Sequence, residues 1–428
     1  MAPEMMGYAG MVILLVLLAL RVPVALSMLL VGFFGFANVI SFDVAPAMIK
    51  LVPLEVLTSY SFSAIPMFIF MGVLASHSGM AGSLFDASRK LFGGWKGGMA
   101  IAAVSSCGVF SAISGSSLAT ASTMSRVALP EMERNGYAPS LATGALAAGG
   151  TLGIMIPPSI ALLLYAIITE QSVGEMFAAG LIPGLMGLLF YCITVTVVVK
   201  VRPGVASPSA PTSLAEKLGS IGGLLPFGGV FALMIGGIYG GLFTPTEGAS
   251  IGAFATLLYA LYRGLRGPGL WQACQETLSL SAIVFFMIVG AETLGYFISA
   301  SRVSFAVTEY VASLGLSNLG VLLCMLALFF VLGCFMDAIA MLLVTVPVVY
   351  PIVTSLGIDP VWFGIVTVLT VELGLITPPV GMNVFVIKAT APHVGLGEIY
   401  RGVAPFIVSD LVRLGLLVAF PILTQLLL

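Results

Sequence analysis

The chain has 428 residues, of which 59% are hydrophobic and 8% are charged. Soluble proteins carry about a quarter charged residues, so this composition excludes a water-soluble globular enzyme and predicts a polytopic protein of the lipid bilayer. The formal net charge of −2, from 16 basic and 18 acidic residues, offers no basic surface and excludes nucleic acid as a partner.

Apolar segments of about 20 residues, the length of a membrane-spanning helix, follow one another along the chain. The segment at 44–58 mixes charges and prolines with apolar residues, which predicts an interfacial helix along the membrane, with a kinked span as the alternative. Two regions, 98–130 and 318–350, are too long for one span and are broken near their middles, so each is predicted to form a re-entrant hairpin. Spans are expected at about 4–20, 22–40, 60–79, 140–170, 176–199, 221–243, 247–262, 278–300, 361–391 and 403–427.

Lysine and arginine concentrate in three loops, around 89–96, 200–217 and 263–266. The positive-inside rule places these loops in the cytoplasm, and the span counts predict that both chain termini lie in the periplasm. The Pro- and Ser-rich stretch within 201–220 is interpreted as a cytoplasmic linker. The expected organisation is N-terminal scaffold helices at 1–60, a first inverted repeat at 61–200, the linker at 201–220, central scaffold helices at 221–277 and a second inverted repeat at 278–428.

An internal repeat has a constant offset of 221 residues. The topology brings the first hairpin in from the cytoplasm and the second from the opposite side, so the repeats are predicted to be inverted, each with a broken helix, near 140–170 and 361–391. Inverted repeats with paired Gly and Pro interruptions are typical of secondary transporters; a simple kink would explain either copy alone. The matching residues are Ala119 and Ala340, Pro130 and Pro351, Gly136 and Gly357, Pro139 and Pro360, Gly153 and Gly374, Pro157 and Pro378, and Pro158 and Pro379.

The interruptions free backbone oxygens that lipid cannot hydrate. In the first repeat, carbonyls near Gly153 and Ile156 face a hairpin tip that carries the hydroxyls of three serines, at positions 114, 116 and 117. Such oxygens suit a hard monovalent cation, although serines in membrane helices also serve for packing alone. Half-helix N-termini beside the breaks favour an anionic substrate group between the tips. The second repeat offers a similar set: the carbonyls of Gly333, Phe335, Ala338 and Gly374 and the hydroxyl of Thr377.

Charged residues at membrane depth are costly, so each is a candidate for function. Asp337, at the second hairpin tip, is the first choice for a role near the substrate. Glu372 is predicted to pair with Lys388, and Glu247 to cap its helix. Three further charged residues receive no substrate role: Arg126 and Arg302, interpreted as interfacial, and Glu292, which is left without an assignment.

Segments throughout the chain resemble the large membrane subunit of the tripartite ATP-independent periplasmic (TRAP) transporters. They are LRVPVA at 20–25, FSAISGSSLAT at 110–120, GGTLGIMIPPS at 149–159, IYGGLFTPTEGA at 238–249 and GLITPPVGMNVFVIKA at 374–389. The resemblance implies an all-α, multi-pass, elevator-type carrier of the bacterial inner membrane, in which a transport domain with two re-entrant hairpins and two broken helices slides against a scaffold. It also implies two partners, a small four-helix membrane subunit and a periplasmic solute-binding protein.

The resemblance further implies two Na⁺ sites and a substrate region. Na⁺ is then the coupling ion, and no other cofactor is expected. The first site is expected at Ser114, Ser117, Gly153, Ile156 and Pro158, the second at Gly333, Gly374, Thr377 and Val380, and the substrate region at Ser116, Asp337 and Asn383.

The expected function is therefore Na⁺-coupled uptake of a small organic acid, such as a C4-dicarboxylate, keto acid or sugar acid, delivered by the periplasmic protein. A stand-alone Na⁺-coupled dicarboxylate or citrate carrier is the alternative. A hydrolase that uses Ser117 and Asp337 is disfavoured because neither residue has a histidine or lysine near it in the sequence. A channel is disfavoured because opposed re-entrant sites suit alternating access, and the sequence has no P-loop for ATP.

Overall fold

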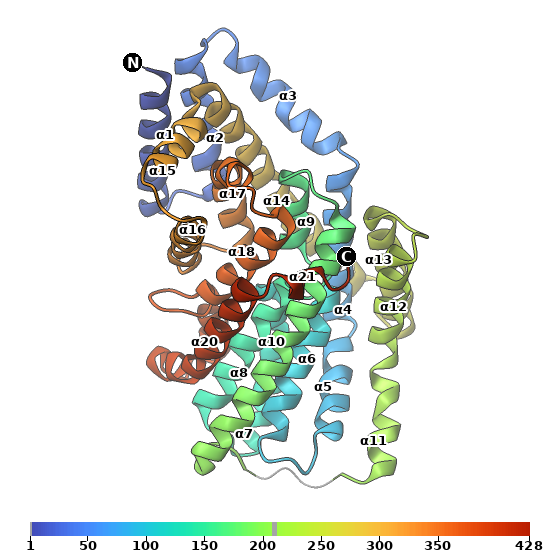
Figure 1. Ribbon diagram of the computed structural model, residues 1–428. Coiled ribbons are helices and arrows are strands. Elements are labelled where there is room, and N and C mark those ends of the chain that lie inside the picture. Colours follow the sequence, from blue (N-terminus) through green and yellow to red (C-terminus); the bar gives the residue numbers. More distant parts are fainter. Residues whose placement is uncertain (1, 208–211) are drawn as a thin grey trace.

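The computed structural model describes residues 2–207 and 212–428, and these residues form helices and connecting loops without a β-strand (Figure 1). The predicted all-α polytopic fold is confirmed. The helices are α1 (Pro3–Ala19), α2 (Val24–Val39), α3 (Ala45–Thr58), α4 (Ala64–His77), α5 (Met80–Leu91), α6 (Gly98–Ser114), α7 (Ser117–Arg134), α8 (Pro139–Thr151), α9 (Ile160–Ile168), α10 (Val173–Val201), α11 (Leu214–Ser220), α12 (Leu225–Tyr239), α13 (Pro245–Tyr262), α14 (Pro268–Ser301), α15 (Val303–Ser313), α16 (Asn318–Gly333), α17 (Ala338–Ser355), α18 (Pro360–Gly374), α19 (Met382–Thr390), α20 (Leu396–Ala419) and α21 (Ile422–Gln425).

Many of the apolar helices are shorter than a full membrane span. Within the described ranges, four helices are long and apolar enough to cross a bilayer, namely α10, α14, α17 and α20. Two bent pairs of helices raise this to six if each pair is one span. One of these pairs joins α3 to α4 with a bend of 62°, and α3 runs obliquely across the top of the molecule (Figure 1). The segment predicted as an interfacial helix is thus a separate helix at a sharp angle to the next one.

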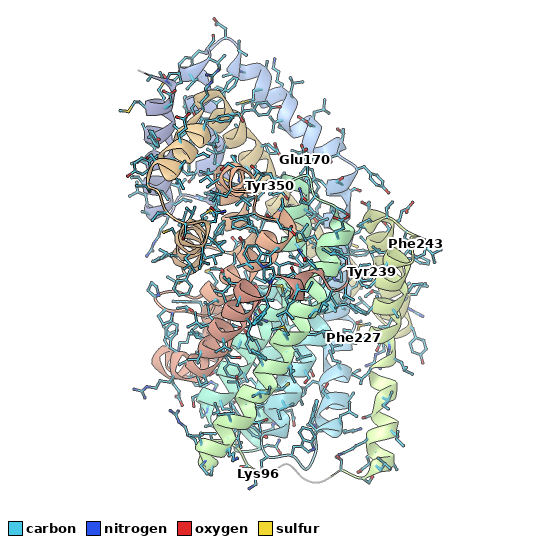
Figure 2. All side chains as sticks on the ribbon, viewed as in Figure 1. Lys96, Glu170, Phe227, Tyr239, Phe243 and Tyr350 are labelled. Atoms are coloured by element: carbon cyan, nitrogen blue, oxygen red, sulfur yellow. The ribbon has the colours of Figure 1, made fainter. Side chains whose placement is uncertain are left out.

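Both predicted hairpins are present. The region 98–130 contains α6 and α7, which meet at Gly115 and Ser116, and the region 318–350 contains α16 and α17, joined by residues 334–337. Figure 1 shows α6 and α7 in the lower half of the molecule and α16 and α17 in the upper half. In Figure 2, Lys96, just before α6, lies at the lower edge, and Tyr350, late in α17, lies in the upper half. The two hairpins therefore enter from opposite ends.

Both predicted broken helices are present as well, and they form the core. The first is interrupted at residues 152–159, between α8 and α9, and the second at 375–381, between α18 and α19. Every residue at 141–160 and at 361–376 is buried. A helix that is apolar on all sides must be surrounded by other helices, and α20 and α16 pack against α8 and α18 respectively.

The backbone repeats itself at the same offset of 221 residues. Gly136 and Gly357 both have positive φ, of 72° and 67°. α8 and α18 both begin with a proline, at Pro139 and Pro360, where the missing N–H costs no hydrogen bond. The identical residues thus hold equivalent structural positions, which supports an internal duplication.

Several helices differ from the predicted elements in length or were not predicted. α14 begins at Pro268, about ten residues before the predicted span. Residues 214–220 of the region interpreted as a linker form α11, because Ser213 and Glu216 make a capping box in which Glu216 Oε2 accepts from Ser213 N at 2.8 Å. Residues 208–211 of that region lie outside the described residues. Two further helices were not predicted, α5 and α15.

Each hairpin tip packs closely on the break of its own repeat. A Cβ atom at Gly153 would lie 2.7 Å from the carbonyl oxygen of Ser116. A Cβ atom at Gly374 would lie 2.6 Å from the carbonyl carbon of Gly333. Only glycine lets the two backbones approach this closely, so the two glycines fix the distance between hairpin and broken helix.

We therefore predict that Gly153→Ala destabilises the protein by about 1–3 kcal/mol, because the added methyl group overlaps backbone that cannot move aside alone. The measurement is the thermal unfolding temperature of the purified protein. Gly415→Ala is the matched control, because a Cβ atom at this position in α20 meets nothing within 4 Å. Equal unfolding temperatures for the two variants would contradict the close packing.

Candidate functional site

A cavity of about 480 Å³ lies between the tips of the two hairpins. Its wall includes Ser114 and Ser116 from the first hairpin and Asp337 from the second. These residues are about 220 positions apart in the sequence, and they come together because the hairpins enter from opposite ends. Helices α4, α7 and α14 supply most of the remaining wall. Three of the residues predicted from the sequence thus line one space.

The predicted residues of the first ion site cluster at the first hairpin tip. Ser114 and Ser117 are both buried, and the hydroxyl of Ser114 is 2.7 Å from that of Thr120. A Cβ atom at Gly115 would lie 3.0 Å from the carbonyl oxygen of Pro158, which places the break directly against the tip. Ile156 instead packs on α10, where its backbone lies against Gly184. The structure therefore brings Ser114, Ser117, Gly153 and Pro158 together, and the side chain and Cα of Ile156 lie against Gly184 of α10.

The predicted residues of the second ion site surround the second break. Gly333 and Gly374 are in direct backbone contact. The hydroxyl of Thr377 donates to the carbonyl of Leu373 at 2.6 Å, which leaves its lone pairs available to a ligand. The carbonyl of Val380 accepts from the hydroxyl of Tyr400 at 2.6 Å. Tyr400 comes from α20, and sequence spacing within the repeat did not indicate it.

Two helix N-termini point at the cavity, and they differ in charge. Ser116 caps α7 by accepting from the N–H of Ala119 at 3.4 Å. Asp337, 221 positions later, caps α17 by accepting from the N–H groups of Ile339 and Ala340 at 3.0 and 3.1 Å. The positive end of α17 is thus already balanced by a carboxylate, whereas the positive end of α7 is capped by a neutral hydroxyl.

Asn383 lies away from the cavity wall. Its side chain is fully buried and donates to the carbonyl of Ala147, in α8 of the other repeat, at 3.2 Å. Its neighbour Met382 lines the cavity. The amide of Asn383 therefore joins the two broken helices.

Arg126, interpreted from the sequence as interfacial, lines the cavity. Its Nη2 atom is 3.3 Å from the hydroxyl of Ser122, and among the described residues it forms no ion pair with a carboxylate. The sequence spacing could have indicated this position, because residues 116, 119, 123 and 126 follow the three- and four-residue steps of one helix face. Arg302 lies at the C-terminal end of α14, as expected.

A histidine and a carboxyl group also contact each other at this cavity. His77, at the end of α4, and Glu276, in α14, approach to 2.7 Å, and both belong to the wall. Among the charged groups of the wall, Arg126 is therefore the cation that remains available to an anion.

The predicted pair of Glu372 with Lys388 is wrong. Glu372 binds Arg413 of α20 at 2.7 Å. The ammonium group of Lys388 instead donates to the carbonyls of Pro392 and Val394 in the loop after α19. A lysine near a helix end satisfies nearby carbonyls locally, whereas the rigid guanidinium of Arg413 reaches the core. Glu247 caps α13 as predicted, through a capping box with Thr244.

Comparisons with known proteins agree with this architecture. Residues 11–423 match the family "Tripartite ATP-independent periplasmic transporter, DctM component". The chain is 36% identical to the C4-dicarboxylate TRAP transporter large permease protein DctM of Pseudomonas aeruginosa, over 85% of this chain and 84% of that protein. It is 31% identical to the sialic acid TRAP transporter permease protein SiaT of Haemophilus influenzae, over 97% of this chain and 67% of that protein.

Comparison with a solved structure supports the fold, but not the function, of this chain. The YdaH transporter of Alcanivorax borkumensis aligns with a TM-score of 0.61 over 89% of this chain and 90% of that chain, at 16% identity. The family match covers nearly the whole chain and includes both hairpins and both breaks. The chain therefore belongs to the large permease subunits of the TRAP transporters, which are multi-pass membrane proteins and secondary transporters rather than enzymes.

Proposed function

We propose that this chain carries a small organic acid across the bacterial inner membrane, coupled to Na⁺, after a periplasmic binding protein delivers it. The observation that carries this proposal is the cavity at which Ser116 and Asp337, from opposed repeats, meet beside two interrupted helices. Such an arrangement suits a substrate and ion site reached alternately from the two sides of the membrane. A small membrane subunit completes the transporter, and both chain termini lie on the periplasmic side.

The ions bind at the two breaks. The oxygens around Ser114, Ser117 and Gly153 form the first site, and those around Gly333, Gly374 and Thr377 form the second. At least two Na⁺ accompany each substrate, because one Na⁺ with a dianion would move net negative charge against the membrane potential. One net positive charge moving through 100 mV contributes about 2.3 kcal/mol, which permits about 40-fold accumulation.

The substrate lies between α7 and α17 with its carboxylate toward α7. The N-terminus of α7 carries the unbalanced positive end of the helix dipole, and Arg126 lies further along the same face of the helix. Asp337 faces the opposite end of the substrate, where its carboxylate can accept from hydroxyl or amino groups. Two relatives are named for the transport of C4-dicarboxylates and of sialic acid, and both of these substrates carry carboxylates. This supports a carboxylate substrate.

The moving body consists of the helices that hold the site. We place α6 to α9 and α16 to α19 in this body, because hairpins and breaks pack on each other. α1 to α4 and α12 to α14 form the scaffold, in which α2 packs along α14 and α4 packs against α13. An elevator movement of the first group against the second would carry the cavity across the membrane.

The proposal predicts uptake of an organic acid into proteoliposomes that hold this chain and its small subunit only when the binding protein and an inward Na⁺ gradient are both present. The measurement is uptake of a panel of radiolabelled acids, with choline replacing Na⁺ as the control. Uptake with Na⁺ but without the binding protein would indicate a stand-alone carrier. Uptake indifferent to Na⁺ would remove the coupling assigned to the two breaks.

For Arg126, we predict that Arg126→Gln raises the KM for the transported acid roughly tenfold, the equivalent of about 1.4 kcal/mol of lost charge-assisted binding. The matched control is Arg134→Gln. Arg134 lies on the same helix but pairs with Glu131 at 3.1 Å outside the cavity wall. The measurement is the KM of uptake, obtained by varying the substrate concentration. Equal KM values for both variants would contradict a role for Arg126 in binding.

Asp337 is expected to have two separable roles, as a helix cap and as a substrate contact. Asp337→Asn keeps a good cap, so we predict an unchanged unfolding temperature together with a loss of at least tenfold in kcat/KM. Asp359→Asn is the control, since Asp359 caps α18 through Val361 and Trp362 away from the cavity. If the two variants transport equally well, Asp337 is only a cap.

A further inference from the structure

A buried polar network lies beside the breaks and outside the cavity wall. Asp410 and Arg413 come from α20, Glu372 from α18, Tyr191 from α10 and Thr151 from the end of α8. All five side chains are at most 1% exposed. Thr151 and Glu372 are 221 positions apart and in direct contact at 2.9 Å, so equivalent residues of the two repeats touch here.

The charges of this network do not balance if both carboxyl groups are ionised. Arg413 approaches Glu372 at 2.7 Å and Asp410 at 3.1 Å. In the part of the chain that the structure describes, no other basic residue forms an ion pair with either of them. Two carboxylates against one guanidinium would leave one negative charge in a site closed to water, which is strongly unfavourable.

The two hydroxyl groups of the network also supply too few hydrogen atoms for its hydrogen bonds. Three oxygen-to-oxygen contacts link the two carboxyl groups: Asp410 to Tyr191 at 2.6 Å, Tyr191 to Thr151 at 3.1 Å and Thr151 to Glu372 at 2.9 Å. Each such contact needs one hydrogen atom, and the two hydroxyl groups supply only two. The hydrogen of Thr151 is also shared with the carbonyl of Ala148, which lies 2.7 Å from its hydroxyl oxygen. The third hydrogen must belong to a carboxyl group.

Asp410 is the carboxyl group that fits a neutral acid. Glu372 accepts well-aligned bonds from Arg413 and Thr151, as a carboxylate does. Asp410 Oδ1 is buried and accepts no hydrogen bond, because Arg413 Nη2, although 3.1 Å away, is not aligned with it. An unpartnered oxygen is tolerable for the carbonyl of a carboxylic acid and costly for a carboxylate.

We propose that Asp410, on α20, is a buried proton-binding site packed against the helices that form the substrate and ion sites. The Asp410 Oδ2–H group donates to Tyr191, and Tyr191 donates to Thr151. Thr151 in turn shares its hydrogen between the carboxylate of Glu372 and the carbonyl of Ala148. The groups that face Asp410 are Tyr191 from α10, Arg413 from its own helix and, beyond Arg413, Glu372 from α18. The proton makes the network neutral and holds α8 and α18 together at the breaks. This inference does not depend on Na⁺ coupling.

Infrared spectroscopy of the full-length protein tests the proposal directly. The wild type at neutral pH is expected to show a carboxylic acid C=O band that is lost in Asp410→Asn and kept in Asp337→Asn. In Tyr191→Phe the band is expected to shift, because the acid loses its hydrogen-bond acceptor. Absence of the band from the wild type, or its persistence in Asp410→Asn, would overturn the proposal.

Stability as a function of pH supplies a second test. The proton stabilises the folded state while it is bound, so the wild-type unfolding temperature is expected to fall at alkaline pH as the proton leaves. Asp410→Asn keeps a donor toward Tyr191 and should show no such decrease. A wild type that instead gains stability from Na⁺ or K⁺, with the gain lost in Asp410→Asn, would show a metal cation in place of the proton and overturn the proposal.

Discussion

The helix interruptions impose the constraint on which the rest of this structure depends. A helix that stops in an apolar interior exposes carbonyl and N–H groups that lipid cannot satisfy, so other parts of the protein or a bound ion must satisfy them. The hairpin tips meet part of this need, because the carbonyl of Gly115 accepts from the N–H of Ile160 at 3.3 Å and the carbonyl of Cys334 accepts from the N–H of Gly381 at 3.1 Å. The same contacts bring two helix N-termini to one cavity. The contacts that satisfy the backbone at the breaks thus also shape the cavity proposed to bind the substrate.

The two repeats are equivalent in backbone and unequal in charge. Ser116 and Asp337 cap equivalent helices, yet only one of them carries a charge. Thr151 and Glu372 occupy equivalent positions, and again only the second is ionisable. In the proposed function, the duplication supplies a symmetric frame for the Na⁺ ions at the two breaks, whereas the substitutions between the copies give the cavity a polarity. An asymmetric substrate can then bind in one orientation.

Charged groups in the core act in pairs or networks, as their burial demands. Arg413 connects α20 to the second broken helix through Glu372, and Thr151 extends this connection to the first. Asn383 adds a further link between the breaks through Ala147. These contacts join α8, α18 and α19 into one core, although none of these three helices is long enough to span a membrane by itself. Tyr191 and Thr151 also connect the proposed proton site at Asp410 to the first interruption.

The sequence by itself determined the class, the duplication, the hairpins and the breaks, because composition, the 221-residue offset and paired glycines and prolines are local or periodic signals. Spacing on one helix could also have indicated that Arg126 shares a face with Ser116. Only the tertiary structure decided that Glu372 pairs with Arg413, that Tyr400 binds Val380, and that Asn383 faces Ala147 rather than the cavity. Each of these contacts joins helices whose relative rotation and height are set by packing, for which the sequence carries no periodic signal.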